Sequence, residues 1–304
     1  MSISINSKKY KIIKELGQGG NGKVYLALNK KDNKYYAIKK ISIEDLTKEE
    51  ISIIENEAKI LSSIHNEHIV RYYDSYKDKE YFYILMEYCE GSDLKKFINE
   101  YKKKNKTINE DIISTIVYEI YLGIKEIHDK NLIHRDLKPE NLFISNDNRI
   151  KIGDFGISKQ LDLNNKYATT SIGTNNYIAP EVVQGKNYNN KVDIWAFGCI
   201  IYELLTLNVC FQSKSLFGFV DMIINKSHGT INKEIYNPKW QDLIDLLLEK
   251  DYKKRPDINE IYNLIMELYC VKKSSLEMKR INKEELNIEK RAKKHLFIRS
   301  KNNF

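Results

Sequence analysis

The sequence predicts an α+β fold with two lobes, a small β-rich lobe with one key helix and a larger α-helical lobe. Three observations favour this bilobal arrangement. The 304 residues are 42% hydrophobic, so the chain can bury a sizeable core. As far as Glu90, short strand-like runs dominate, whereas beyond Gly91 apolar residues recur mainly at helical spacing. This change of period predicts strands and helices that occupy separate layers.

The first lobe is predicted to contain five strands and one long helix. Strand-like runs bounded by Gly and Asp-Asn turn residues cover residues 10–16, 23–29, 35–41, 70–76 and 81–87. Between the third and fourth runs, residues 46–64 repeat apolar side chains at helical spacing. We therefore expect an amphipathic helix there, with its apolar side against the strands.

The second lobe is predicted from long amphipathic segments. Helices are expected over residues 111–130, 192–207, 239–249 and 258–269, and short strands over 142–144 and 150–152. We therefore divide the chain into a domain over residues 8–268 and an extension. Within the domain, the first lobe covers about residues 8–86, the hinge 87–91 and the second lobe 92–268. A basic extension, helical or disordered, follows over 270–304.

Composition excludes several classes of protein. The N-terminus has no basic region followed by a long apolar one, so no secretory signal is expected. The most apolar stretch, residues 195–205, contains Glu203 and is too short to span a bilayer. Four widely spaced cysteines without a C-x-x-C pair predict free thiols in a cytoplasmic or nuclear protein, rather than a zinc site or a disulfide framework.

The positive charge is concentrated at the C-terminal end. Residues 271–304 hold 11 lysines and arginines against 4 acids, a net of +7 out of +8 for the chain. A solvated extension is the common meaning of such a run. Binding of this basic tail to a partner or an anionic surface is the second interpretation. No basic patch interleaved with aromatic residues accompanies it, so no clear nucleic-acid site is predicted.

A glycine-rich segment lies between the first two predicted strands. Gly17, Gly19, Gly22 and Val24 form the pattern G-x-G-x-x-G-x-V. A dinucleotide-binding fingerprint is one interpretation, but it requires a helix directly after the glycines. Because a strand is predicted instead, we favour a loop that folds over phosphate groups, where glycine lets backbone amides approach the oxygens.

Residues 134–141 read His-Arg-Asp-Leu-Lys-Pro-Glu-Asn and match H-R-D-L-x-x-x-N at every fixed position. The tripeptides D-F-G at 154–156 and A-P-E at 179–181 follow in order. On these motifs the chain resembles the eukaryotic protein kinases, and the run K-P-E at 138–140 resembles the serine/threonine type. The resemblance implies the bilobal protein kinase fold and transfer of the γ-phosphate of Mg-ATP to protein Ser/Thr hydroxyls.

The resemblance also implies separate catalytic roles. Asp136 would orient the substrate hydroxyl and accept its proton, and Lys138 would neutralise charge on the transferred phosphoryl group. Asn141 and Asp154 would hold Mg²⁺, with Mn²⁺ also suited to such hard oxygen ligands.

The resemblance places the lysine of the third kinase strand at Lys39, because Ala37-Ile38-Lys39 resembles the V-A-I-K motif of that strand. A pair between Lys39 and Glu57 of the predicted helix would hold the lysine against the α- and β-phosphates. Taken alone, each of these two side chains would be interpreted as a solvated surface residue.

The implied ATP site draws on the glycine-rich strands and the hinge. Met86 would be the gatekeeper, the backbones of Glu87 and Cys89 would bind the adenine edge, and Asp93 would reach the ribose. Asn21, at the tip of the glycine-rich loop, replaces the aromatic residue often found in kinases. The implied ATP-binding residues are Leu16, Gly17, Gly19, Gly22, Val24, Ala37, Lys39, Met86, Glu87, Cys89 and Asp93.

Three residues have implied structural roles. Glu181 of the A-P-E motif would pair with Arg255 in a buried ion pair. Asp193 would hold the backbone of the catalytic loop without touching substrate. Loss of one partner of the ion pair would strand a buried charge.

Regulation is predicted in the activation segment. We expect phosphate on Thr170 to pair with Arg135 and Lys159 and to order the loop. Thr174 would instead contact the catalytic loop beside Asp136. The other hydroxyl residues there, Thr169 and Ser171, are interpreted as polar loop residues.

Finer features resemble the NIMA-related kinases, notably the hinge run M-E-Y-C-E-G-S-D-L at 86–94 and D-F-G-I-S at 154–158. Other serine/threonine groups remain open, because Ala179 stands where serine is frequent in that group. A pseudokinase, acting as a nucleotide-regulated scaffold, is the alternative function. Retention of Lys39, Asp136 and Asp154 argues against it.

Overall fold

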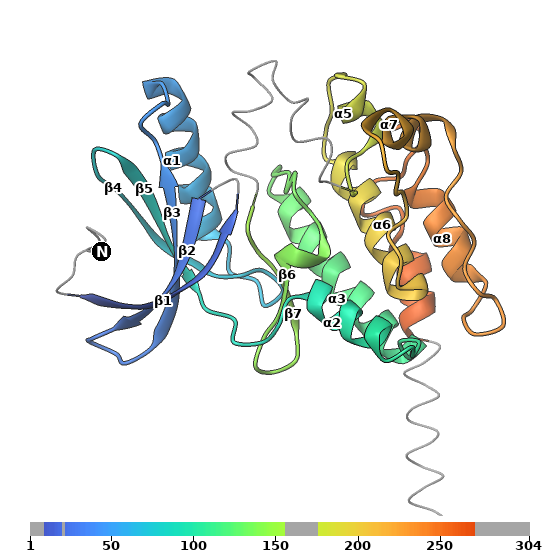
Figure 1. Ribbon diagram of the computed structural model, residues 1–304, viewed down its shortest axis with the longest axis horizontal. Helices are drawn as coiled ribbons and strands as arrows, with labels where there is room; N and C mark the ends of the chain where they lie inside the picture. Colours follow the sequence, from blue (N-terminus) through green and yellow to red (C-terminus); the bar gives the residue numbers. More distant parts are fainter. Residues whose placement is uncertain (1–8, 20–21, 156–175, 271–304) are drawn as a thin grey trace, which may run out of the picture.

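The first lobe is built on a five-stranded antiparallel sheet with strand order β1-β2-β3-β5-β4. The computed structural model describes residues 9–19, 22–155 and 176–270, and the other positions lie outside this description. The strands are β1 (Tyr10–Gly19), β2 (Gly22–Asn29), β3 (Tyr35–Ser42), β4 (Tyr72–Lys77) and β5 (Tyr81–Glu87). Figure 1 shows this sheet on the left, in blue to teal, and we call it with its helix the sheet lobe.

Helix α1 (Lys48–Ser63) lies beside the sheet and contacts β4. It begins two residues later than predicted, where Thr47 caps it. Thr47 Oγ1 accepts a hydrogen bond from Glu50 N at 3.2 Å, and the Glu50 carboxylate accepts one from Thr47 N at 2.8 Å. This capping box satisfies two backbone amides. Ile54 and Leu61 are fully buried, so the predicted apolar side of the helix faces the core.

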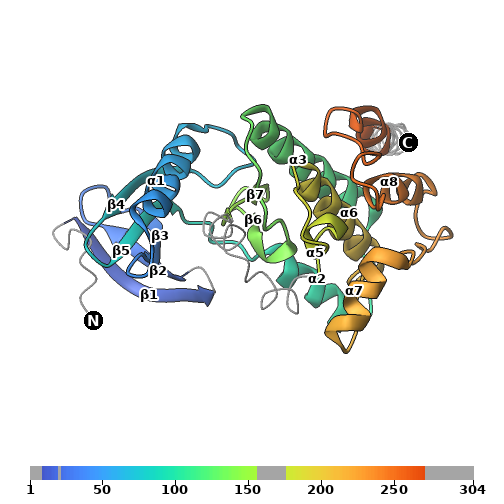
Figure 2. The same cartoon turned by 90° about the horizontal axis from the view of Figure 1, so that it is seen from above.

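The second lobe, which we call the helical lobe, packs around one central helix. Its helices are α2 (Leu94–Lys103), α3 (Glu110–Asp129), α5 (Pro180–Val183), α6 (Lys191–Thr206), α7 (Leu216–Asn225) and α8 (Lys239–Leu247), and residues 262–270 are also helical. Helix α6 contacts both α3 and α8 (Figures 1 and 2). It is apolar nearly all round and buried along most of its length, as expected of a core helix.

The predicted α+β bilobal fold is confirmed, but the sequence pattern revealed neither the four-residue α5 nor the two longer helices α2 and α7. In α2 only Leu94 and Ile98 are buried, and lysines occupy much of the remaining surface, so the apolar repeat is short. In α7 the side chain of Phe217 is 85% exposed, which breaks the expected correspondence between apolar residues and burial. Packing and capping, rather than periodicity, define these helices.

A small hairpin lies where the two lobes meet. Strands β6 (Leu142–Ile144) and β7 (Ile150–Ile152) follow the 3₁₀ turn η1 (Pro139–Asn141). Isolated bridges join Ile69 to Ile152 and Asp93 to Phe143, so the hairpin is attached to the segments entering β4 and α2. The residues before η1 and after β7 are thereby placed side by side.

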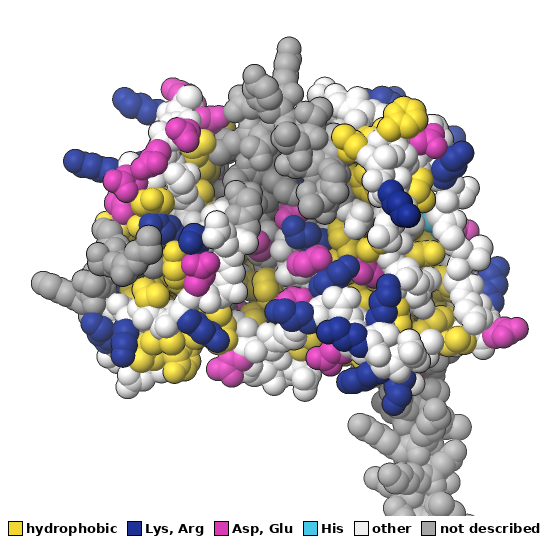
Figure 3. All heavy atoms as spheres, in the orientation of Figure 1, with side chains coloured by type: hydrophobic (Ala, Val, Ile, Leu, Met, Phe, Trp, Pro, Cys, Tyr) yellow, Lys and Arg dark blue, Asp and Glu magenta, His cyan; other side chains and the backbone are white. Residues whose placement is uncertain are grey.

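The surface carries both signs of charge. Figure 3 shows acidic and basic side chains interspersed over the drawn face, with lysine and arginine side chains gathered over α2. Among the described residues, no helix has the length and apolar character needed to cross a membrane.

Candidate active site

The described glycines of the glycine-rich segment lie at the antiparallel paired ends of β1 and β2. Gly17 pairs with Val24, and Gly19 pairs with Gly22. Gly22 has φ +117°, and a Cβ there would lie 2.1 Å from the carbonyl oxygen of Lys40. Only glycine fits this position without displacing the backbone. A strand follows the glycines, so the dinucleotide-fingerprint interpretation is excluded. Asn21, at the predicted tip, lies outside the described residues.

A cavity of about 560 Å³ lies between these strands, the hinge and the hairpin. Val70 and Phe143, which the sequence did not identify, also line it. Its mixture of apolar walls with a few polar groups is typical of a small-molecule site. Eight predicted ATP-binding residues line the cavity: Leu16, Gly17, Val24, Ala37, Met86, Glu87, Cys89 and Asp93.

The hinge residues differ in how far they are already engaged. Among the described residues, the Cys89 backbone makes no hydrogen bond, so its amide and carbonyl are available to a ligand edge. Burial, and then the Glu87 carboxylate, raise the pKa of the Cys89 thiol to about 12. Asp93 instead caps α2: it accepts a hydrogen bond from Lys96 N at 2.9 Å and pairs with Lys96 Nζ at 2.8 Å.

The catalytic loop brings three predicted residues together. Asp136 is 3% exposed, and its Oδ2 lies 2.8 Å from Lys138 Nζ. Asn141 Nδ2 donates to Asp136 O at 2.7 Å and to Asp136 Oδ2 at 3.1 Å. These contacts fix the aspartate carboxylate and leave the Asn141 amide oxygen as its ligand atom.

Asp193 on α6 holds this loop from beneath. Its Oδ2 accepts a hydrogen bond from His134 N at 2.8 Å, and its Oδ1 accepts one from Arg135 N at 3.0 Å. His128 Nε2 donates to the same carboxylate at 2.9 Å. Burial opposes ionisation of Asp193, but the hydrogen bonds from His128 and the loop outweigh it and lower the Asp193 pKa. This carboxylate supports the φ +65° of Arg135.

His134 is a functional residue that the sequence assigned no role. Its Nδ1 accepts a hydrogen bond from Asp136 N at 3.3 Å, and its Nε2 lies 3.1 Å from Gly153 O. Burial lowers the His134 pKa, so the ring is neutral with the proton on Nε2. The histidine therefore links the catalytic loop to the backbone just before Asp154.

Charged residues of the two lobes pair with one another. Lys39 on β3 forms an ion pair with Asp154, which has φ +54°. Glu57 Oε1 on α1 lies 3.5 Å from Arg135 Nη1. The predicted Lys39–Glu57 pair is thus not formed in this arrangement, because Asp154 engages the lysine and Arg135 engages the glutamate.

Glu57 is poorly satisfied where it lies. Its side chain is buried, and Oε2 has no hydrogen-bond partner within the part of the chain that the structure describes. Burial raises the Glu57 pKa, and the Arg135 and Lys39 cations only partly oppose this. Both cations therefore interact with the same carboxylate.

Phe155 packs next to this network. It is 1% exposed and meets the Tyr72 ring edge-on, with centroids 5.8 Å apart, while the His134 ring lies 4.7 Å away. Tyr72, on β4, was not identified from sequence because an aromatic residue in a strand is ordinary core. These rings fix the residue that follows Asp154.

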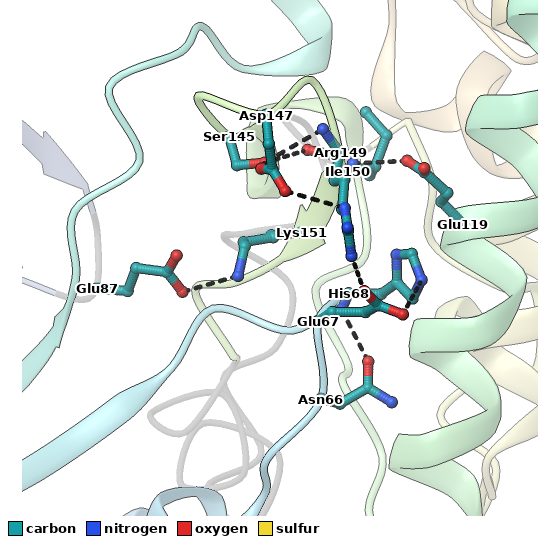
Figure 4. A network of polar contacts seen from close by, with 10 residues as sticks. All are labelled: Asn66, Glu67, His68, Glu87, Glu119, Ser145, Asp147, Arg149, Ile150 and Lys151. Carbon is teal, nitrogen blue, oxygen red and sulfur yellow. Dashed lines mark hydrogen bonds and ion pairs between the residues drawn. The ribbon is translucent and has the colours of Figure 1, made fainter.

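Behind the hinge, a polar network joins the hairpin to both lobes (Figure 4). Lys151 Nζ on β7 lies 3.0 Å from Glu87 Oε2, and the same carboxylate oxygen accepts a hydrogen bond from Arg71 N. Arg149 pairs with Asp147 and Glu67. No short-range pattern identified this network, since the partners that join the hairpin to other elements lie far apart in sequence.

Glu181 and Arg255 form a buried bidentate ion pair. The guanidinium donates to Glu181 Oε1 at 2.7 Å and Oε2 at 3.0 Å, and it also donates to Lys191 O at 2.8 Å. Both side chains are almost completely buried, at 0% and 2% exposure. The bidentate geometry connects the start of α5 to the segment after α8.

Most of the predictions for the activation segment concern residues that the structure does not describe. Thr170, Thr174 and Lys159 lie outside the described residues, as does the basic tail. Arg135 is the predicted regulatory residue whose surroundings the structure describes.

Comparison with known proteins decides the family. The sequence profile of the protein kinase domain matches residues 10–265. The chain belongs to the protein kinase family. This kinase is 38% identical over 254 residues to human serine/threonine-protein kinase Nek5. The aligned region covers 83% of this chain and 36% of Nek5.

Two further relatives extend the similarity. The kinase is 35% identical to mouse serine/threonine-protein kinase Nek1 over 254 residues, 84% of this chain and 21% of Nek1. It is 33% identical to probable serine/threonine-protein kinase nek2 of Dictyostelium discoideum over 275 residues, 89% of this chain and 65% of that protein. The resemblance predicted from the hinge is thereby confirmed, and the kinase spans only part of the length of these relatives.

Proposed function

We propose that this kinase transfers the γ-phosphate of Mg-ATP to serine and threonine hydroxyls of protein substrates. The observation that carries the proposal is the catalytic loop, where the side chains of Lys138 and Asn141 each lie within hydrogen-bonding distance of the Asp136 carboxylate. The cavity lined by the predicted ATP residues opens toward Asp154. The serine/threonine names of its relatives agree with the K-P-E run after the catalytic aspartate.

In this mechanism the protein positions groups and stabilises charge. Asp136 accepts a hydrogen bond from the substrate hydroxyl, orients its oxygen toward phosphorus and takes its proton. Lys138 is held beside that carboxylate at 2.8 Å, so its cation can shift to the phosphoryl oxygens as charge develops. Asp193 and His134 keep the loop in place during transfer.

Asp154 and Asn141 suit magnesium. They offer a carboxylate and an amide oxygen, which are the hard ligands that Mg²⁺ prefers. No cluster of three or more metal-binding side chains occurs within the described ranges, so the remaining ligands would be phosphate and water oxygens. The ion, or Mn²⁺ in its place, supplies charge neutralisation at the phosphates.

Lys39 and Glu57 complete the proposed reactive arrangement. Lys39 leaves Asp154 for the α- and β-phosphates, and Glu57 leaves Arg135 to support the lysine. Thr170 phosphate would compete for the same Arg135 guanidinium, together with Lys159, so we include activation-segment phosphorylation as the control of this step. If Thr170→Ala autophosphorylates and reaches wild-type activity after prior dephosphorylation, this control is wrong.

The test of function is phosphate transfer from ATP to a mixed protein substrate, followed by phosphoamino-acid analysis. Asp136→Asn should reduce transfer by roughly 10²–10⁴-fold. Asp129→Asn, an exposed aspartate that pairs with Lys125, is the matched control and should retain activity.

Phosphoserine and phosphothreonine are the expected products. Nucleotide binding without transfer would favour the pseudokinase alternative. Transfer that survives in Asp136→Asn would point to another enzyme or to another mechanism.

We infer a reducing compartment, cytoplasmic or nuclear, from the cysteines. Within the described residues, Cys89, Cys199, Cys210 and Cys270 form no disulfide. Fractionation of cells that express a tagged chain tests this, and recovery in a secretory compartment would contradict it.

A further inference from the structure

A buried carboxylate in the helical lobe is neutralised by a lysine from a different helix. Glu203 on α6 is buried, and its Oε1 accepts a hydrogen bond from Lys95 Nζ of α2 at 2.7 Å. Its Oε2 accepts one from the Tyr177 hydroxyl at 2.5 Å, and Lys95 Nζ lies 3.4 Å from Tyr177 Oη. Three segments that are far apart in sequence therefore meet at this carboxylate. None of the three residues has a role in the proposed phosphate transfer.

Lys95 is held by Glu203 rather than by its own helix. It stands in the first turn of α2, where no residue is acidic. A cation is unfavourable there, because this end of the helix dipole is positive. The carboxylate offsets that cost, since burial strengthens the attraction between opposite charges. The Lys95 side chain is 25% exposed, whereas that of Glu203 is 3% exposed. The pair thus presents its cation, and not its carboxylate, to solvent.

This ion pair lies beside the catalytic loop. Helix α2 contacts η1 (Pro139–Asn141), and Asn141 donates to the Asp136 carboxylate. Tyr177 comes just before the A-P-E motif that ends the activation segment. Because Lys95 contacts Tyr177 as well as Glu203, its ammonium marks the place where α2 meets the end of that segment.

We propose that Lys95 is a specificity-determining residue that excludes basic side chains from the substrate position next to it. The inference rests on the proposed function, in which a protein segment brings its hydroxyl to Asp136 and passes over the adjoining surface of α2. Glu203 would bind the guanidinium or ammonium group of a substrate, but the Lys95 ammonium already occupies this carboxylate. A second cation would meet like charge and find no unpaired anion. The kinase therefore takes uncharged or acidic side chains at this position.

The test compares the wild type with Lys95→Ala on peptides in which arginine or alanine is placed in turn at each position around one serine or threonine. Without the ammonium, Glu203 faces the substrate, so Lys95→Ala should gain a preference for arginine at one position. There the ratio of kcat/KM for the arginine peptide to that for the alanine peptide should rise at least about tenfold over wild type. This is the low end of what a hydrogen bond to a charged group contributes. Equal ratios in both proteins at every position would overturn the proposal.

Further variants separate charge from structure. Lys95→Arg keeps a cation at Glu203 and should retain the wild-type selectivity. Lys102→Ala is the matched control, since Lys102 lies on the same helix but donates to Asn208 at the protein surface, and it should also leave the selectivity unchanged. The double variant Lys95→Ala/Glu203→Gln should lose the gained preference, because the amide carries no charge. A preference for arginine that persists in the double variant would show that Glu203 does not bind it, and the proposal would be wrong.

Thermal unfolding of each variant shows whether it is folded before its selectivity is measured. If Lys95→Ala does not fold, Lys95→Gln takes its place, because it keeps a neutral donor beside Glu203, and it should show the same gain with a smaller fold-change. A wild type that transfers phosphate to none of the peptides would contradict the proposed function itself. Transfer with unchanged selectivity in the folded variant would contradict only the role of Lys95.

Discussion

The two lobes differ in how they hold the charged residues of the site. In the helical lobe, buried charges find partners within the same lobe: Asp193 with the catalytic loop and His128, and Glu181 with Arg255. In the sheet lobe, Lys39 and Glu57 pair with Asp154 and Arg135 of the other lobe. The helical lobe is therefore a prebuilt support, whereas the reactive geometry of the sheet lobe depends on contacts between lobes.

The largest expected effect tests the support. Arg255→Met leaves the buried Glu181 carboxylate without its partner, so we expect a loss of about 3–5 kcal/mol in the free energy of unfolding. Urea denaturation measures this loss. The control Lys125→Met breaks an exposed pair and should cost less than about 1 kcal/mol. Equal losses for both variants would show that the buried pair is not a support.

The second prediction concerns the cross-lobe lysine. Lys39→Met should reduce kcat/KM by roughly 10²–10³-fold, because it removes the cation that the proposed mechanism brings to the α- and β-phosphates. The free energy of unfolding should change far less than for Arg255→Met, since Asp154 keeps 35% of its side chain exposed. Kinetics and denaturation on the same preparation decide this. If Lys39→Met lost as much stability as Arg255→Met, the two lobes would not differ in how their charged residues contribute to folding.

The third prediction concerns pH. Because burial raises the Glu57 pKa, the folded state binds this proton more tightly than the unfolded state does. Glu57 therefore costs stability as pH rises above its ordinary value of 4.5, and this cost is absent at lower pH. Glu57→Gln should gain roughly 1 kcal/mol relative to wild type at pH 7, with less gain near pH 4. Denaturation at several pH values measures the difference, and a gain independent of pH would contradict it.

The smallest expected effects compare helix caps in the two lobes. Thr47→Ala removes the capping box of α1, and Ser215→Ala removes the side-chain cap of α7. Each should cost about 0.5–2 kcal/mol. Hydrogen exchange should show the loss locally, in the first turn of the affected helix. Faster exchange throughout the chain in either variant would indicate that the cap supports more than its own helix.

The sequence was sufficient to predict which residues lie together when they are closely spaced along the chain. Asp136, Lys138 and Asn141 occur within six positions of one loop, so their proximity is set by local backbone geometry. The strands and α1 were also predictable, because period and turn residues are local signals. The exposed Phe217 shows why α7 was missed, since that apolar side chain does not face the core.

Sequence could not predict contacts that depend on lobe placement. Lys39 and Asp154 are 115 positions apart, and His128 and Asp193 are 65 apart, so nothing local encodes their distances. Lys39 pairs with Asp154 and Glu57 pairs with Arg135 because of how the two lobes are placed. For the same reason, the polar network behind the hinge could not be predicted from the sequence.

Arg135 has a consequence for the energetics of activation. Asp193 fixes its backbone in the helical lobe, while its guanidinium engages Glu57 of the sheet lobe. Glu57 thus has two competing cations, and their relative free energies set the fraction of molecules with a Lys39–Glu57 pair. Another anion that binds Arg135 only after Glu57 has left it would shift this ratio toward the Lys39–Glu57 pair. Each 1.4 kcal/mol of its binding free energy would change the ratio about tenfold. Within the proposed function, Arg135 would therefore convert a local binding event into a change in the population of molecules that hold the Lys39–Glu57 pair.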